Sequence, residues 1–142
     1  MSLREFEREV VSVSLETPVI EAARRMRDAR VGCVIVSRNL LPVGVLTDRD
    51  LAVRVVAEGR DPEKTKVADV VTYDPVTVRS SDTRQTALIR MREHGVRRLP
   101  IIDDDGKLIG LVTSDDLITL LAHELLDLGA GIEGNVDASE SR

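Results

Sequence analysis

The sequence has very few aromatic residues, a single cysteine and no excess of positive charge. It contains no Trp, one Phe (Phe6) and one Tyr (Tyr73), so it lacks the aromatic platforms on which proteins stack single-stranded nucleic acid. Its formal net charge of -5 disfavours binding to duplex DNA or to an anionic membrane through bulk charge. The lone Cys33 excludes a disulfide within these 142 residues and a cysteine-based metal site.

Long apolar runs are also absent. No run approaches the roughly 18–20 residues that a membrane span needs, and the first ten residues lack the apolar core of a signal peptide. We therefore expect no membrane span, no nucleic-acid partner and a cytoplasmic location. Hydrophobic residues make up 42% of the chain, which is enough for a buried core of aliphatic side chains.

The chain contains an internal repeat. Residues 11–26 align with residues 76–91 at a spacing of 65, and the spacing becomes 66 after the turn at 103–106. Beyond that turn the copies share identical residues: Gly44 with Gly110, Thr47 with Thr113, Asp50 with Asp116, and Leu51 with Leu117. Two copies are too few for a solenoid, and each is too small to bury its own core well. The repeat therefore predicts a pseudo-two-fold pair of half-domains.

Apolar spacing predicts the same order of elements in each copy. Val19, Ala22 and Met26 share one helical face, and Ala87 and Met91 repeat that pattern. Short apolar runs at 33–36, 43–46, 99–102 and 108–112 are typical of strands buried on both faces. Helices are expected over 48–58 and 114–128. The predicted fold is α/β (α+β), with two pseudo-symmetric strand–helix–strand–strand–helix repeats packed through their sheets.

These elements predict domain boundaries. We expect an N-terminal extension at 1–9, the first repeat at 10–60, a linker at 61–72 and the second repeat at 73–128. Residues 129–142 contain three glycines, several polar residues and no period, so they are predicted to be a disordered tail.

A polar motif, Gly-x-x-Thr-x-x-Asp, occurs at 44–50 and again at 110–116. Thr followed three residues later by Asp is close to a capping box, which serves only to start a helix. A hydroxyl and free N–H groups at a helix start also suit an anion such as phosphate, and a carboxylate can accept hydrogen bonds from ribose hydroxyls. The motif glycine allows either another backbone or a flat base to approach closely. The repetition of the whole set favours a ligand site.

The sequence resembles a tandem pair of cystathionine beta-synthase (CBS) domains, or Bateman module, over roughly residues 8–126. The second copy, HGVRRLPIIDDDGKLIGLVTSDDL, is close to the family pattern. The first copy departs from it, with Gly32-Cys33 where the second has Arg97-Arg98, and without a proline equivalent to Pro100. A conventional lead-in segment before Val11 is also missing, whereas residues 70–75 resemble one for the second copy.

The resemblance implies a non-catalytic protein that binds an adenosine-containing ligand in clefts between the copies. Thr47 and Asp50 would line one cleft, and Thr113 and Asp116 the other. Arg49 would suit a phosphate. The lead-in strands and the starts of the buried strands would surround the base. The implied ligand-binding residues are Thr47, Asp48, Arg49, Asp50, Thr113, Ser114, Asp115, Asp116, Val13, Val78, Gly32, Cys33, Arg97, Arg98 and Pro100. Which cleft binds better stays open.

The function predicted on this basis is a regulatory module that senses AMP, ADP, ATP or S-adenosylmethionine and modulates an unknown partner protein. No nucleophile–base pair, Walker-type loop or metal-ligand cluster can be named, so we predict neither catalysis nor a catalytic cofactor. The leucine-rich helix at 114–128 carries more apolar residues than one buried face needs, which predicts a homodimer interface. The alternative is a ligand-independent interaction module in which the Thr-x-x-Asp motifs are only helix caps.

Overall fold

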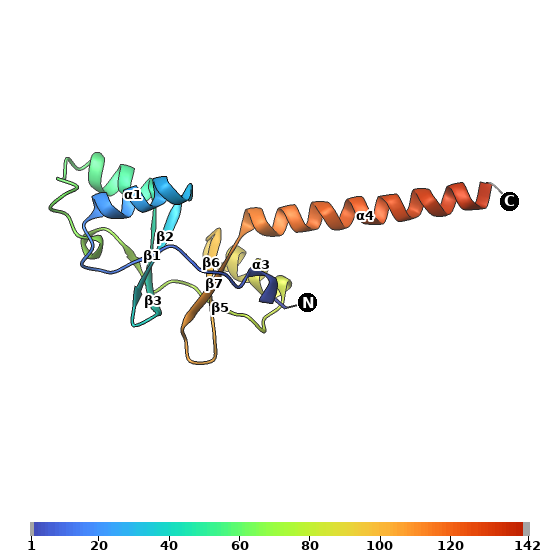
Figure 1. The fold of residues 1–142 in the computed structure, drawn as a ribbon, viewed down its shortest axis with the longest axis horizontal. Coiled ribbons are helices and arrows are strands. Elements are labelled where there is room, and N and C mark those ends of the chain that lie inside the picture. Colours follow the sequence, from blue (N-terminus) through green and yellow to red (C-terminus); the bar gives the residue numbers. More distant parts are fainter. Residues whose placement is uncertain (1, 141–142) are drawn as a thin grey trace.

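The computed structural model describes the backbone of residues 2–140 and the side chains of residues 2–131. Its two halves lie beside each other along the long axis of the molecule, and one helix projects far beyond them (Figure 1). The predicted strand–helix–strand–strand–helix order is confirmed in both halves.

The first half holds β1 (Ser12–Val13), α1 (Val19–Ala29), β2 (Cys33–Arg38), β3 (Leu41–Thr47), α2 (Asp48–Leu51) and the π-helix η2 (Ala52–Val56). The second holds β5 (Val78–Arg79), α3 (Arg84–His94), β6 (Arg98–Ile102), β7 (Leu108–Thr113) and α4 (Ser114–Glu140). The sheets have the strand orders β1-β2-β3-β4 and β5-β6-β7, where β4 is Thr72–Tyr73. In each, the short first strand is parallel to the next and the long hairpin is antiparallel.

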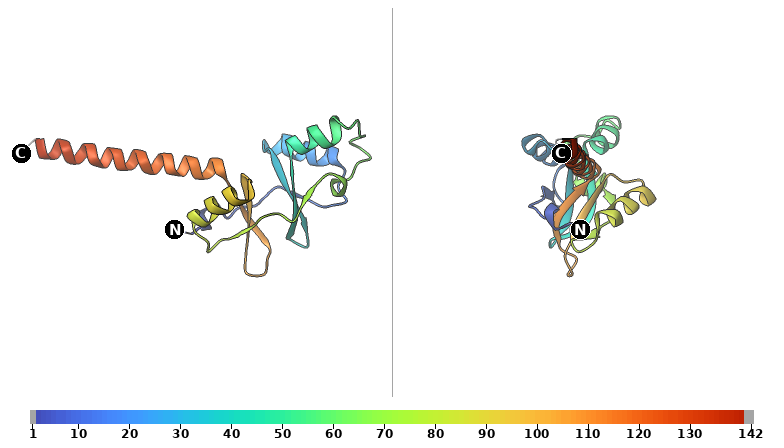
Figure 2. Two further views of the ribbon diagram at one scale, coloured as in Figure 1. Left: turned by 180° about the vertical axis from the view of Figure 1, so that it is seen from behind. Right: turned by 90° about the vertical axis from the view of Figure 1, so that its right-hand side faces the viewer.

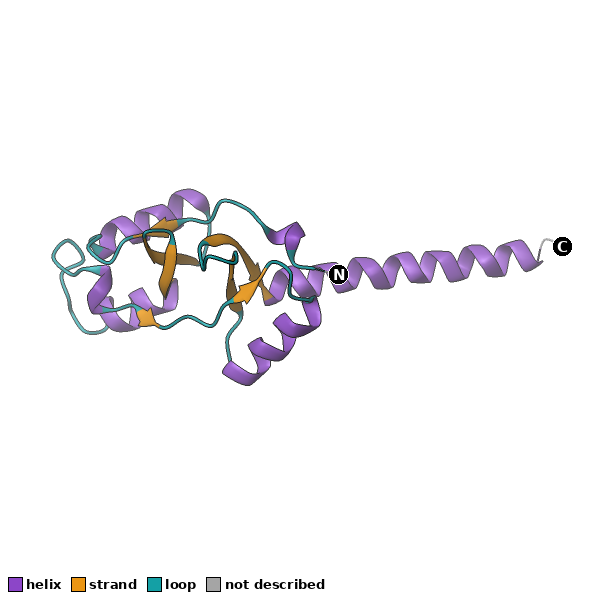
Figure 3. Cartoon of the chain, turned by 90° about the horizontal axis from the view of Figure 1, so that it is seen from below, coloured by secondary structure: helices purple, strands orange, loops and turns teal. Residues whose placement is uncertain are grey.

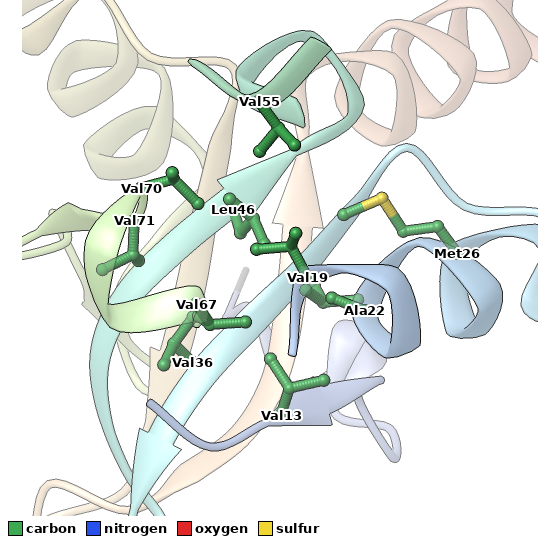
Figure 4. Close-up of a cluster of buried hydrophobic side chains, with 11 residues drawn as sticks. Val13, Val19, Ala22, Met26, Val36, Leu46, Val55, Val67, Val70 and Val71 are labelled. Atoms are coloured by element: carbon green, nitrogen blue, oxygen red, sulfur yellow. The ribbon is translucent and has the colours of Figure 1, made fainter. Parts of the chain in front are cut away.

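The core of the first half is aliphatic. Val19, Ala22 and Met26 face the sheet from one side of α1, and Leu46 and Val36 meet them from β3 and β2 (Figure 4). An equivalent cluster in the second half contains Ala87 and Met91 of α3. The helical periodicity of the sequence therefore identified the buried faces correctly, because successive turns of a helix place every third or fourth residue on one side.

The two sheets also pack against each other. Along β2, Val34 and Val36 face the first core, while Cys33 and Ile35 point the other way and join Leu111 of β7 in a separate buried cluster. A strand buried on both faces needs an unbroken apolar run, which explains why residues 33–36 do not alternate with polar residues.

The N-terminal segment, predicted as an extension at 1–9, lies on the second half. Leu3 is fully buried in the second core, and the short helix η1 (Arg4–Phe6) follows it. Glu7 bridges to Gly110 of β7. This segment supplies the lead-in whose absence the sequence suggested, but it packs on the repeat that is distant in sequence.

The predicted linker, residues 61–72, packs on the first half, as the N-terminal segment packs on the second. Val67, Val70 and Val71 are part of the first core (Figure 4), and η3 (Val67–Asp69) leads into β4, which pairs with β3. The N-terminal segment and residues 67–73 each precede one repeat and pack on the other half, and we call them the crossing segments. Their close approach explains why each motif has a glycine. A Cβ on Gly44 would lie 2.5 Å from Val71 Cγ2, and one on Gly110 would lie 2.5 Å from the Phe6 carbonyl oxygen.

Residues 129–140, for which the sequence predicts a disordered tail, continue α4 to Glu140 in the structure; residues 141 and 142 lie outside the described residues. Glycine lowers helix stability by roughly 1 kcal/mol but does not forbid a helix, and residues 114–140 contain no proline to end one. The view from behind shows α4 extending away from both halves (Figure 2).

Candidate functional site

Both Thr-x-x-Asp motifs form capping boxes. The Asp50 N–H donates to Thr47 Oγ1 at 3.1 Å, and the Thr47 N–H donates to Asp50 Oδ2 at 2.9 Å. Thr113 and Asp116 make the same pair of bonds, each at 3.0 Å. The capping interpretation is therefore correct for both motifs. It does not exhaust their chemistry, because the hydroxyl proton of each Thr and the second oxygen of each Asp are not used by these bonds.

A cavity of about 690 Å³ lies beside the first motif. We call it the first cleft. Its wall comes from both repeats: one side is the end of β3 and the start of α2, and the other is the lead-in to β5 and the turn between α3 and β6. The lining residues are Val45, Thr47, Asp48, Arg49, Asp50, Thr72, Tyr73, Asp74, Pro75, Val76, His94, Gly95, Val96, Arg97 and Arg98. Its volume is in the range of small-molecule sites in proteins.

The first cleft unites a large part of the predicted ligand set. Thr47, Asp48, Arg49 and Asp50 face Arg97 and Arg98 across it. Three arginines therefore line the cleft, together with three aspartates, Asp48, Asp50 and Asp74. The N-terminus of α2 also favours negative charge. Asp50 Oδ1 lies 3.6 Å from the Arg54 guanidinium on the next turn, which fixes the orientation of that carboxylate.

Gly32 lies at the edge of this arrangement. A Cβ there would lie 3.2 Å from Asp48 Oδ2 and 3.4 Å from the Arg98 guanidinium. The Gly32 carbonyl accepts the Asp48 N–H at 2.9 Å, and the Arg97 carbonyl accepts the Ser114 N–H at 2.8 Å. The two repeats therefore share one contact. The residue before β2 or β6 accepts a hydrogen bond from the first residue of α2 or α4.

The second motif faces different surroundings. Arg8, from the N-terminal segment, donates to the Leu111 carbonyl at 3.1 Å and to Asp116 Oδ2 at 3.4 Å. We call the surroundings of Thr113–Asp116 that Arg8 contacts the second site. Asp115 and Asp116 also line a smaller cavity of about 310 Å³ against α4, together with Glu5, Phe6, Thr119, Leu120 and His123.

The remaining predicted residues are buried in the scaffold. Val13 and Val78 belong to the first and second cores, so the lead-in to β5 lines the first cleft through Asp74, Pro75 and Val76 instead. Pro100 is buried in β6, opposite Leu111. Cys33 is buried between the sheets, and this burial raises the pKa of its thiol, with nearby Asp48 contributing in the same direction.

Sequence reasoning missed the contribution of residues 72–75 to the first cleft. Tyr73 lines it and donates its hydroxyl to the Ala68 carbonyl at 2.8 Å. The resemblance of residues 70–75 to a lead-in segment predicted that the backbone enters the second repeat here. It did not predict which of these side chains would face the cleft. The wall of the cleft therefore includes one aromatic side chain, that of Tyr73.

The comparisons with known proteins agree with the fold. The model of the CBS domain family matches residues 3–57 and again residues 67–123. Each matched range begins with a segment that packs on the other half, because Leu3 lies in the second core and Val67 lies in the first. Among the described residues, the helices include none that is long and apolar enough to cross a membrane.

An uncharacterized protein of Methanopyrus kandleri is 38% identical over 112 residues, and the chain spans 57% of that protein's length. A putative signal-transduction protein with CBS domains from Burkholderia ambifaria has a similar structure, with a TM-score of 0.77, 27% identity and coverage of 85% of this chain and 93% of that one. A CBS domain protein of Pyrobaculum aerophilum, solved in complex with AMP, has a TM-score of 0.74 and 26% identity, with coverage of 82% and 90%.

Proposed function

The chain belongs to the CBS domain family, and we propose that it is a regulatory module that binds an adenosine-containing ligand in the first cleft and modulates a partner protein. The observation that carries this proposal is the cavity of about 690 Å³ in which Thr47 and Asp50 of one repeat face Val76 and Arg97 of the other. A cavity shared by two half-domains suits a sensor better than a cavity within one of them.

The groups in the first cleft match the parts of a nucleotide. Asp50 Oδ1 is positioned to accept a hydrogen bond from a ribose hydroxyl, and the Thr47 hydroxyl can donate its proton to a ligand oxygen. Arg49 and Arg97 suit phosphate oxygens, since guanidinium–phosphate hydrogen bonds are charge-assisted. Val45, Val76 and Tyr73 offer apolar surface to the base. AMP, ADP, ATP and S-adenosylmethionine share the adenosine that these groups would contact.

Regulation follows from the placement of the cleft. A ligand that touches both repeats binds most tightly at one relative position of the repeats, and it therefore shifts the population towards that position. A partner that prefers the same position gains affinity by the same factor. The AMP complex of the Pyrobaculum aerophilum protein, 26% identical to this chain, supports a ligand of this class.

Arg8 at the second site sets the expected stoichiometry. Because Arg8 pairs with Asp116 and the Leu111 carbonyl, a ligand entering there must displace two hydrogen bonds of the protein itself. We therefore expect one ligand for each chain, bound in the first cleft.

The test is a thermal-shift screen with AMP, ADP, ATP and S-adenosylmethionine, with GTP as the control. A ligand at 100 times its Kd adds about 2.7 kcal/mol of stability, which raises the Tm of a domain of this size by roughly 10 °C. Stabilisation by adenine ligands but not by GTP supports the proposal. No stabilisation by any of them contradicts it and favours the ligand-independent interaction module.

Variants then locate the site. Arg49 and Arg97 are exposed, so alanine at both positions should leave the fold intact. The loss of charge-assisted hydrogen bonds should weaken AMP about 10- to 100-fold and leave adenosine, which has no phosphate, nearly unchanged. Arg92→Ala is the matched control, because Arg92 is an exposed arginine of α3 that does not line the cleft. Equal losses for Arg92→Ala and Arg97→Ala would contradict the site.

A further inference from the structure

α4 leaves the body of the protein after its first turns. Leu117 is buried in the second core, and Leu120 lines the small cavity against the N-terminal segment. From residue 121 to residue 131 every described side chain is exposed. The helix has 27 residues and is about 40 Å long, and the view from below shows its outer part free of other elements (Figure 3).

The exposed part carries a regular apolar stripe. Ile118, Leu121, Leu125 and Leu128 are 62%, 45%, 69% and 61% exposed. They are separated by three, four and three residues, which is the spacing of positions a and d in a heptad. We call these four residues the α4 seam. In the sequence, Ile132 is the next residue at the same spacing. A solitary helix gains nothing from such a stripe, since helix stability in proteins comes mostly from packing of an apolar face.

The residues of the seam and the charges around it indicate which partner covers it. Leu121 and Leu128 stand at d positions, and Ile118 and Leu125 stand at a positions. A β-branched residue at a with Leu at d, as in the heptad of Ile118, favours two parallel strands. Residues 114–140 contain no Lys or Arg, yet the acidic side chains avoid the seam. Asp127 lies at an outer position of the heptad, and across a parallel pair Glu124 would face Gly129, which carries no charge.

Glu124 is also neutralised within its own chain. Arg84 of α3 pairs with Glu124 and lies 3.1 Å from Glu5 of the N-terminal segment. This clamp fixes the base of α4 on the body, so the seam projects in a defined direction rather than swinging about a flexible joint. From these observations we propose that a second copy of this chain packs on the α4 seam, and that the two helices form a parallel pair.

The test compares two adjacent leucines. Leu125 lies on the seam and Leu126 does not, yet their side chains are 69% and 70% exposed. The parent protein and Leu126→Glu should be dimers in sedimentation velocity at tens of micromolar, and Leu125→Glu should be a monomer, with its dissociation constant raised at least 10-fold. All three should have the same Tm at monomeric concentrations, because neither leucine contributes to a core.

Three outcomes would overturn the proposal: a monomeric parent, a dimer that Leu125→Glu leaves intact, or equal effects of the two substitutions. The orientation is tested by cross-linking. Leu128→Cys should form a disulfide dimer on mild oxidation, because a parallel pair places identical d positions opposite each other, and Leu126→Cys should not. A failure of Leu128→Cys to cross-link would overturn the parallel arrangement. The native Cys33 is buried and does not interfere.

Discussion

Leu3 offers the sharpest stability prediction, because it lies only two residues from the start of the chain and is nevertheless 0% exposed. Its side chain is part of the second core, and its N–H lies 3.0 Å from the Ser80 carbonyl and 3.1 Å from that of Asp82. Leu3→Ala keeps the backbone bond and removes the buried side chain. The loss of transfer free energy and the cavity left behind should together lower the free energy of unfolding by about 3 kcal/mol.

The assay is urea unfolding followed by circular dichroism, with thermal unfolding in parallel. For a domain of this size the Tm should fall by roughly 10 °C. Leu126→Ala is the control, because that leucine is exposed and its loss should change stability by less than about 0.5 kcal/mol. If Leu3→Ala and Leu126→Ala had the same small effect, the N-terminal segment would not be part of the second core, and the account of the crossing segments would be refuted.

Three further predictions follow from single sites. Gly110→Ala should destabilise the fold, since its Cβ would lie 2.5 Å from the Phe6 carbonyl oxygen. Gly129→Ala has open space around it and should stabilise α4 by up to about 1 kcal/mol. Chemical denaturation should show that the free energy of unfolding falls in the first variant and rises in the second. Cys33 should react with a thiol reagent at pH 8 no faster than the protein opens. Burial raises the pKa of this thiol above its ordinary value of 9.0, so just above pH 9 the unfolded chain loses the thiol proton and the folded chain keeps it. The free energy of unfolding should therefore fall as the pH rises above 9 in the parent and not in Cys33→Ala. Equal pH profiles for the two proteins would contradict this. Arg8→Ala should expose Asp116 at the second site and add a second, weaker binding event for each chain in calorimetry, and an unchanged stoichiometry would show that Arg8 does not block this site.

The sequence predicted the repeated elements well, because local patterns determine them. Val19, Ala22 and Met26 needed only helical periodicity, and Gly95, which has a φ of 64°, ends α3 as a glycine in the left-handed region commonly does. α1 ends in another way, because Arg30, a residue that is not glycine, takes the left-handed conformation there with a φ of 56°. No local propensity indicates that choice.

Contacts distant in sequence were harder to predict. Leu3 gives no local sign that it packs on β-strands about a hundred residues away, and the glycines of the tail suggested disorder although a helix tolerates them. The candidate site divides in the same way. Thr47 and Asp50 were predicted from a motif, whereas Tyr73 reaches the cleft only because its segment crosses to the other repeat.

Titration calorimetry with AMP measures directly whether the first cleft binds an adenosine-containing ligand. We expect saturable binding with one AMP for each chain, competition by ADP, ATP or S-adenosylmethionine when these ligands bind, and no binding of GMP. Absence of binding for all four adenosine ligands, or equal binding of AMP and GMP, would contradict the proposed function.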